Sequence, residues 1–139
     1  MPVREAVIVD IARTAFGKRK GSLAGWHPTD LLGFTLRQLV DRNNLDPELL
    51  DDIVCGCVTQ SGEQGCNVAR NAVIAGGLPW TLSATSVDRQ CGSSQQALHF
   101  VAASVISTEI TSCQAGAAPT ATSTGIATGA VNGMNPSTW

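Results

Sequence analysis

The chain has 139 residues, of which 43% are hydrophobic and 14% charged, and its formal net charge is −2. This length suits a single domain with a buried core, and the charge balance lacks the basic face that nucleic-acid binding requires. The apolar runs are far shorter than the roughly 20 residues of a membrane span, so we expect neither a nucleic acid nor a membrane as a partner.

Cysteine usage indicates a reducing compartment. The odd set of five comprises Cys55, Cys57, Cys66, Cys91 and Cys113. The first residues lack the apolar core of a signal peptide, so we expect reduced thiols and a cytoplasmic location rather than a disulfide framework. Cys55 and Cys57 could join Cys66 and His27 around a metal, but their spacing matches no common zinc pattern. Small core residues are the favoured interpretation, and we expect no metal.

The first half of the chain predicts a strand followed by two helices. Residues 5–11 read EAVIVDI, in which the apolar residues Ala6 to Val9 follow one another, and this pattern is typical of a strand covered on both faces. A helix is expected to begin at Pro28, with Thr29 or Asp30 as its cap, and to end at Asn43-Asn44. A second, short helix is expected with Asp46 as its cap and Pro47 at its first position. The buried stripe expected on the longer helix consists of Leu32, Leu36, Leu39 and Val40.

The middle of the chain predicts a second strand at 53–59, a polar loop at 60–65 and a helix at 66–75. Gly76-Gly77 should stop this helix. Its inward residues are expected to be Val68, Ala69, Ala72 and Val73. Apolar strands that alternate with helices favour an α/β fold with a mostly parallel sheet.

The stretch from Ser83 to Ser107 reads as a buried strand, Ser83–Val87, that runs into a helix with Cys91 at or just before its first turn. The unpaired N–H groups and partial positive charge of a first turn stabilise a thiolate. The same N–H groups could hold an oxyanion, and Gly92 would allow a close approach. The alternative is that Cys91 is a small buried hydrophobe. Two rows should face a core, one of Ala97, Val101 and Val105, the other of Leu98, Ala102 and Ile106.

Three motifs carry a family resemblance. VDRQCGSSQQALH resembles the nucleophile segment of the thiolases, and EAVIVDIARTAFGKRKGSL resembles their opening strand and the loop after it. DDIVCGCVTQSGEQGCNVARNAVIAGGLP resembles their second strand, following helix and turn. The resemblance, which runs from Val3 to Ile106, implies a layered thiolase-like α/β fold, present as an incomplete N-terminal half with a mostly parallel sheet flanked by helices. It also implies an acyltransferase of fatty-acid and lipid metabolism.

The resemblance implies roles for individual residues. Cys91 would accept the acyl group of an acyl-CoA, with CoA thioesters as substrates and no further cofactor. Gly92, Ser93 and Gln64 are weaker candidates for substrate binding, as is Gln60. In thiolases the strand before the nucleophile pairs with its counterpart in a dimer, so we expect a homodimer or a higher oligomer.

The two histidines and a run of basic residues are expected to take no part in catalysis. The family's histidine lies beyond this C-terminus, so His27 is expected at the surface and His99 in helix packing. Lys18-Arg19-Lys20 is expected to be a solvated turn rather than a contact to CoA phosphates.

Residues 1–107 are therefore interpreted as a partial thiolase N-terminal domain, and residues 108–139 as an atypical tail rich in Ala, Thr, Ser and Gly. Ala115-Gly116-Ala117 weakly resembles the next strand and loop, and the composition favours loop or partial disorder. The family's remaining catalytic residues lie in a part that this chain lacks, so enzymatic competence stays open. The alternatives are a catalytically incomplete interaction module and a thiol-sensing module, the latter disfavoured because there is no C-x-x-C.

Overall fold

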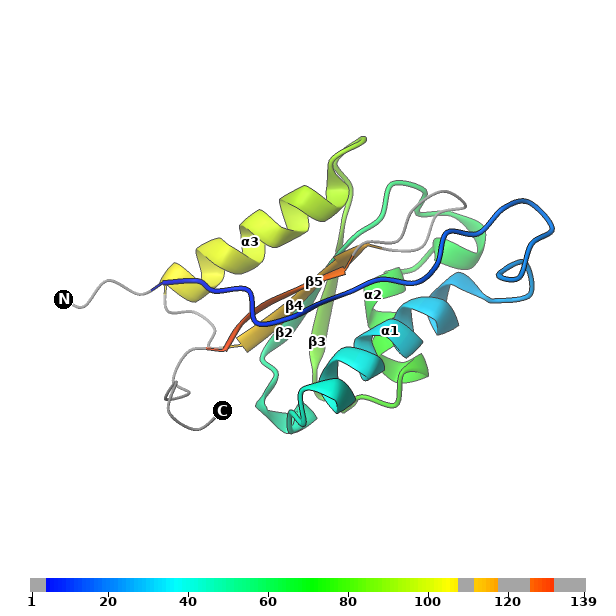
Figure 1. The fold of residues 1–139 in the computed structure, drawn as a ribbon. Coiled ribbons are helices and arrows are strands. Elements are labelled where there is room, and N and C mark those ends of the chain that lie inside the picture. Colours follow the sequence, from blue (N-terminus) through cyan, green and yellow to red (C-terminus); the bar gives the residue numbers. More distant parts are fainter. Residues whose placement is uncertain (1–4, 108–111, 118–125, 132–139) are drawn as a thin grey trace.

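The computed structural model describes residues 5–107, 112–117 and 126–131, and in the last two ranges it defines the backbone only. A five-stranded sheet separates two helices on one face from one helix on the other (Figure 1). The helices are α1 (Pro28–Arg42), α2 (Val68–Ala75) and α3 (Ser93–Ser107), with short 3-10 helices η1 (Pro47–Leu49) and η2 (Gly62–Gln64). The strands are β1 (Ile11–Ala12), β2 (Asp52–Gly56), β3 (Ser83–Val87), β4 (Ser112–Ala117) and β5 (Ile126–Val131). None of the helices in these ranges combines the length and hydrophobicity needed to cross a bilayer.

The sheet has a parallel centre and an antiparallel side. Its strand order is β1-β5-β4-β2-β3, and β2 runs parallel to both of its neighbours. β5 runs antiparallel to β4, and β1 antiparallel to β5. The expected α/β fold with a mostly parallel sheet flanked by helices is therefore confirmed. β4 and β5 come from the segment interpreted as a tail, yet both belong to this sheet; the domain boundary at residue 107 stays a prediction.

The expected opening strand is wrong for most of its length. Only Ile11 and Ala12 of the opening region form a strand, and they pair with β5 at the sheet's edge. The apolar side chains of Val7, Ile8 and Ile11 are 49%, 54% and 64% exposed rather than covered on both faces. The reason is topological, because β3 and β4 already occupy both edges of β2. The run therefore has no place in the parallel centre.

The alternating side chains of β2 divide the core between the two faces of the sheet. Ile53 and Cys55 point into the cluster formed with α1 and α2, whereas Val54 packs with Ala97 and Val101 of α3. The inward residues expected for α1 and α2 are all buried, which confirms those stripes. On α3 the row from Ala97 to Val105 is buried. The second row faces the core only in part, since Leu98 packs against the cluster around Val54 but Ile106 is 52% exposed.

The N-terminus of α1 is capped by histidine, which is not one of the residue types usually preferred as N-caps. His27, not Thr29 or Asp30, is the cap, and its Nδ1 accepts a hydrogen bond from the Thr29 N–H at 3.2 Å. Two other helix ends follow expectation, since Asn43 closes α1 and the Asp46 carboxylate accepts the N–H of Glu48 at the start of η1. The helix expected from residue 66 begins at Val68 instead.

We expect His27→Asp to raise the free energy of unfolding by about 0.5 to 1 kcal/mol, because aspartate is a preferred cap and its charge suits the helix dipole. Urea denaturation at neutral pH measures the change. His99→Asp, in the middle of α3, is the matched control and should give no gain. Equal or lower stability of the His27 variant would contradict this role for the cap.

Candidate active site

Cys91 lies on a tight turn between β3 and α3, two residues before the helix begins. Its side chain is exposed, and its φ of 59° is left-handed, which is uncommon for a residue with a side chain. Such backbone strain persists only where the surroundings enforce it, and it is concentrated at functional sites. The predicted position of Cys91 is confirmed, and the alternative of a buried hydrophobe is wrong.

The turn around Cys91 is closed by hydrogen bonds between its two ends. The N–H of Gly92 donates to the Arg89 carbonyl at 2.7 Å. The Ser93 hydroxyl accepts the N–H of Arg89 and donates to the carbonyl of Arg89, both at 3.0 Å. Ser93 is buried, so its hydroxyl holds the turn from the protein side. The expected contact of Ser93 with substrate stays a prediction.

The first turn of α3 keeps free donors beside Cys91. Within the described residues, the N–H groups of Ser93, Ser94 and Gln95 donate to no protein atom. Unpaired N–H groups at a helix start bind negative charge. They are therefore available to a thiolate or to an oxyanion formed next to it.

Cys66 provides a comparison within the same chain. It is also exposed, has a φ of 53° and stands two residues before a helix, α2. The second and third donors of α2 are already used, however, because the N–H of Ala69 donates to the Ser86 hydroxyl and that of Arg70 to the Asn67 side chain. Two exposed cysteines thus share a backbone geometry, but among the described residues three N–H groups at the start of α3 have no partner next to Cys91, whereas at the start of α2 only that of Val68 has none.

The start of α3 rests directly on the end of β2. A Cβ added to Gly56 would lie 2.3 Å from the carbonyl carbon of Ser93 and 2.3 Å from the nitrogen of Ser94. Only glycine allows this approach. The contact places Cys91 at the carboxyl ends of β2 and β3, where parallel sheets bind ligands.

Comparison with known proteins assigns this arrangement to a family. The family model described as thiolase, N-terminal domain, matches residues 6–128. The chain belongs to the thiolase family. It is 48% identical over 103 residues to a steroid 3-ketoacyl-CoA thiolase of Mycobacterium tuberculosis, a match that covers 74% of this chain and 25% of that protein.

Other curated thiolases match to a similar extent. A 3-ketoacyl-CoA thiolase of Saccharophagus degradans is 48% identical over 105 residues, covering 74% of this chain and 27% of that protein. A beta-ketoadipyl-CoA thiolase of Escherichia coli is 44% identical over 104 residues, covering 74% of this chain and 26% of that protein. The chain thus spans about a quarter of the length of these relatives.

In this thiolase-family domain, Cys57 and Gln64 lie together at the carboxyl ends of β2 and β3, where the site is. The Cys57 N–H donates to the Val87 carbonyl at 2.9 Å, and its thiol donates to Oε1 of Gln64 at 3.4 Å. Burial, with the nearby Asp88 carboxylate as a smaller cause, raises the pKa of the Cys57 thiol. Cys57 is therefore held as a neutral thiol, and a Gln64 contact to substrate stays a prediction.

The remaining candidates are less closely tied to the site. A Cβ added to Gly92 would lie 3.6 Å from the Arg89 side chain, an ordinary contact distance, so packing alone does not require glycine at this position. Gln60 is exposed and donates from its amide to the Cys57 carbonyl at 3.1 Å.

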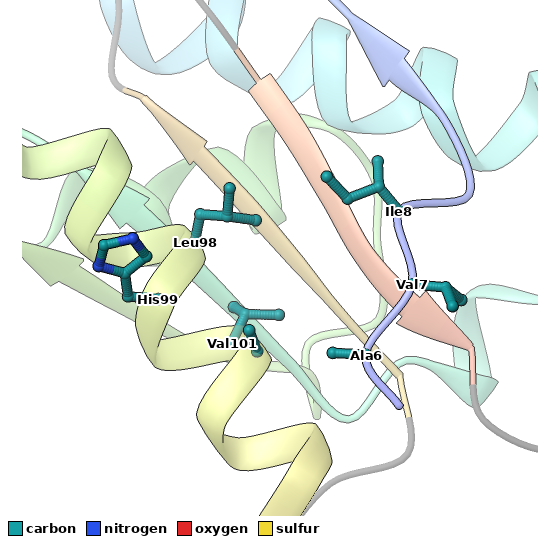
Figure 2. A pocket seen from close by; sticks show the side chains of 7 residues that line it. Ala6, Val7, Ile8, Leu98, His99 and Val101 are labelled. Atoms are coloured by element: carbon teal, nitrogen blue, oxygen red, sulfur yellow. The ribbon is translucent and has the colours of Figure 1, made fainter. Parts of the chain in front are cut away.

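The two histidines lie away from Cys91 in the fold. His27 caps α1 at the surface, as already described. His99 was expected to pack but is exposed, because it stands two residues from both Ala97 and Val101 and so projects from the opposite side of α3. It borders an apolar pocket of about 230 Å³ between α3 and the opening segment, where Ile8 faces Leu98 and Ala6 faces Val101 (Figure 2).

The side chains that hold β3 in place were missed by sequence reasoning. Asn67 adopts a left-handed φ of 62°, donates to the Ala84 carbonyl at 2.9 Å and accepts the Ser86 hydroxyl at 2.9 Å. Arg70 donates to the carbonyls of Trp80 and Leu82. β3 was expected to be buried, but among the described residues it is a partly exposed edge strand, which Asn67 bonds at Ala84 and Ser86 and Arg70 bonds just before its first residue.

Proposed function

We propose that this domain carries the acyl-accepting nucleophile of a thiolase-type acyltransferase and that Cys91 is this nucleophile. The observation that carries the proposal is the exposed Cys91 on its strained turn, next to unpaired N–H groups of α3, in a chain of the thiolase family. The relatives' names indicate 3-ketoacyl-CoA thioesters as the substrate class. A role in fatty-acid metabolism, with no cofactor beyond the CoA thioester, and a cytoplasmic location are part of the proposal.

The acylation step follows from the geometry of the turn. The Cys91 thiolate attacks the carbonyl carbon of the thioester, a new sulfur–carbon bond forms, and the carbonyl oxygen becomes an oxyanion next to the free N–H groups. When the oxyanion collapses, the bond between the acyl carbon and the CoA sulfur breaks. The CoA thiolate leaves and takes up a proton, which balances the proton lost earlier by Cys91.

Neither histidine of the chain is proposed as the base of this reaction. His27 is engaged as a helix cap, and His99 projects from the middle of α3 beside an apolar pocket. A full catalytic cycle needs a base in addition to the nucleophile. We therefore propose acyl acceptance by this domain, and not the full catalytic cycle.

Acetyl-CoA tests the proposal directly. Incubation at neutral pH should add one acetyl group to the chain by intact mass, and peptide mapping should place it on Cys91. Cys91→Ala should abolish the adduct, whereas Cys66→Ala, the matched exposed cysteine, should retain it. Iodoacetamide should also modify Cys91 severalfold faster than Cys66. An adduct that persists without Cys91, or equal alkylation of both cysteines, would overturn the assignment.

We further propose that the domain self-associates through β3, the strand at the end of the sheet. Within the part of the chain that the structure describes, this strand pairs with β2 alone, and an edge without a strand neighbour is a template for another strand. Light scattering at micromolar concentration should give at least twice the mass of the 14.4 kDa chain. A monomer would contradict this proposal without affecting that for Cys91.

A further inference from the structure

A loop outside the site concentrates positive charge. Residues 13–27, here called the basic loop, contain Arg13 and the run Lys18-Arg19-Lys20, and no acidic residue stands between Asp10 and Asp30. The chain has nine cationic residues in all, so the other five stand against eleven acidic ones. The basic loop therefore opposes the charge of the rest of the molecule.

The cations of the basic loop are available to a partner. All four are exposed, and the ion pairs found among the described residues use Arg37 and Arg42 instead. Consecutive turns shape the loop, with the Gly21 N–H donating to the Lys18 carbonyl and the Trp26 N–H to the Leu23 carbonyl. Figure 1 shows the loop, in blue, projecting beyond the first turn of α1.

Exposed aromatic rings accompany these cations. Phe16 is 60% exposed, and the Arg13 guanidinium lies 4.6 Å from the centre of its ring. Trp26 is 46% exposed and contacts the ring of Phe34 at a centroid distance of 5.8 Å. The two limbs of the loop meet where Gly17 packs against Leu23, so the rings flank the same narrow projection.

We propose that the basic loop binds the surface of a bilayer that contains anionic phospholipid. Clustered Lys and Arg are attracted to the negative potential of such a surface, by roughly fivefold in affinity per residue. Exposed Trp and Phe partition into the headgroup region of a bilayer. A soluble polyanion has no such apolar boundary for the rings to enter. The early expectation of no membrane partner rested on the absence of a spanning segment, which does not exclude surface binding. This inference is independent of Cys91.

Vesicle co-sedimentation of the full chain tests the proposal. The chain should bind vesicles of phosphatidylserine and phosphatidylcholine, bind pure phosphatidylcholine poorly, and dissociate as salt is raised from 0.1 M to 0.5 M, where screening is stronger. Replacing Lys18, Arg19 and Lys20 together by glutamine should weaken binding by about a hundredfold. Arg19→Gln alone should weaken it about fivefold, and the matched control Arg37→Gln on α1 should leave it unchanged.

The aromatic contribution has its own test. In a Trp80→Phe, Trp139→Phe background, Trp26 is the remaining tryptophan, and brominated lipid in the anionic vesicles should quench its fluorescence. The proposal is overturned if the triple variant binds as well as the parent, if both vesicle types bind equally, or if brominated lipid leaves Trp26 unquenched. Tighter, loop-dependent binding to RNA or to polyglutamate would assign the loop to another polyanion and would equally overturn it.

Discussion

Replacing Gly56 by alanine should destabilise the domain and slow the reaction of Cys91 at the same time. The added methyl carbon would lie 2.3 to 2.7 Å from backbone atoms of Ser93 and Ser94, where no flexible side chain can move aside. Either β2 or the first turn of α3 must therefore shift. We expect a loss of about 3 kcal/mol in the free energy of unfolding, as for strong overpacking of a core.

The shift should also reach the turn around Cys91, because the Ser93 hydroxyl is bonded to both backbone groups of Arg89. Urea denaturation measures the stability, and the rate of iodoacetamide modification of Cys91 measures the turn. Gly25→Ala is the matched control, because a Cβ there meets no atom within 4 Å. If both variants matched the parent in stability and rate, Gly56 would not set the position of α3.

Much of the fold near Cys91 was predictable because its signals are local. The β-branched residues of Ser83–Val87 and the helical spacing of Ala97, Val101 and Val105 predicted the strand and the helix with nearly correct limits. These two limits place Cys91 in the connection without any tertiary information. Gly56 also left a signal that went unused, since a glycine inside a strand pattern often marks a close backbone approach.

What could not be predicted depends on contacts between distant segments. The run at residues 5–11 has the apolarity of a central strand. Which strands lie next to β2, however, depends on which pair with it more favourably, and β4 occupies the side of β2 opposite β3. The bonds from Asn67 to β3 join residues 17 and 19 positions apart. Histidine is an unusual helix cap, so neither composition nor spacing identified His27.

The buried thiol of Cys55 should make the domain unstable at alkaline pH. Cys55 is inaccessible to solvent, and burial, with smaller contributions from Cys57 and Asp52, raises its pKa from 9.0 to about 12. Between these values the unfolded chain releases a proton that the folded chain keeps. The folding equilibrium constant should therefore fall by about tenfold for each pH unit above 9, whereas this thiol has no effect below that pH.

Denaturant unfolding at pH 7.5, 9 and 10.5 measures this slope, with Cys55→Ala as the comparison. The variant loses a buried sulfur and should be somewhat less stable at neutral pH, but its stability should fall less steeply between pH 9 and 10.5. The difference in slope isolates Cys55, since the raised pKa of Cys57 contributes to both proteins, and the absence of tyrosine removes another group that ionises there. Parallel slopes would show that Cys55 ionises in the folded domain. This is contrary to what we expect from its position on β2, packed against α1 and α2.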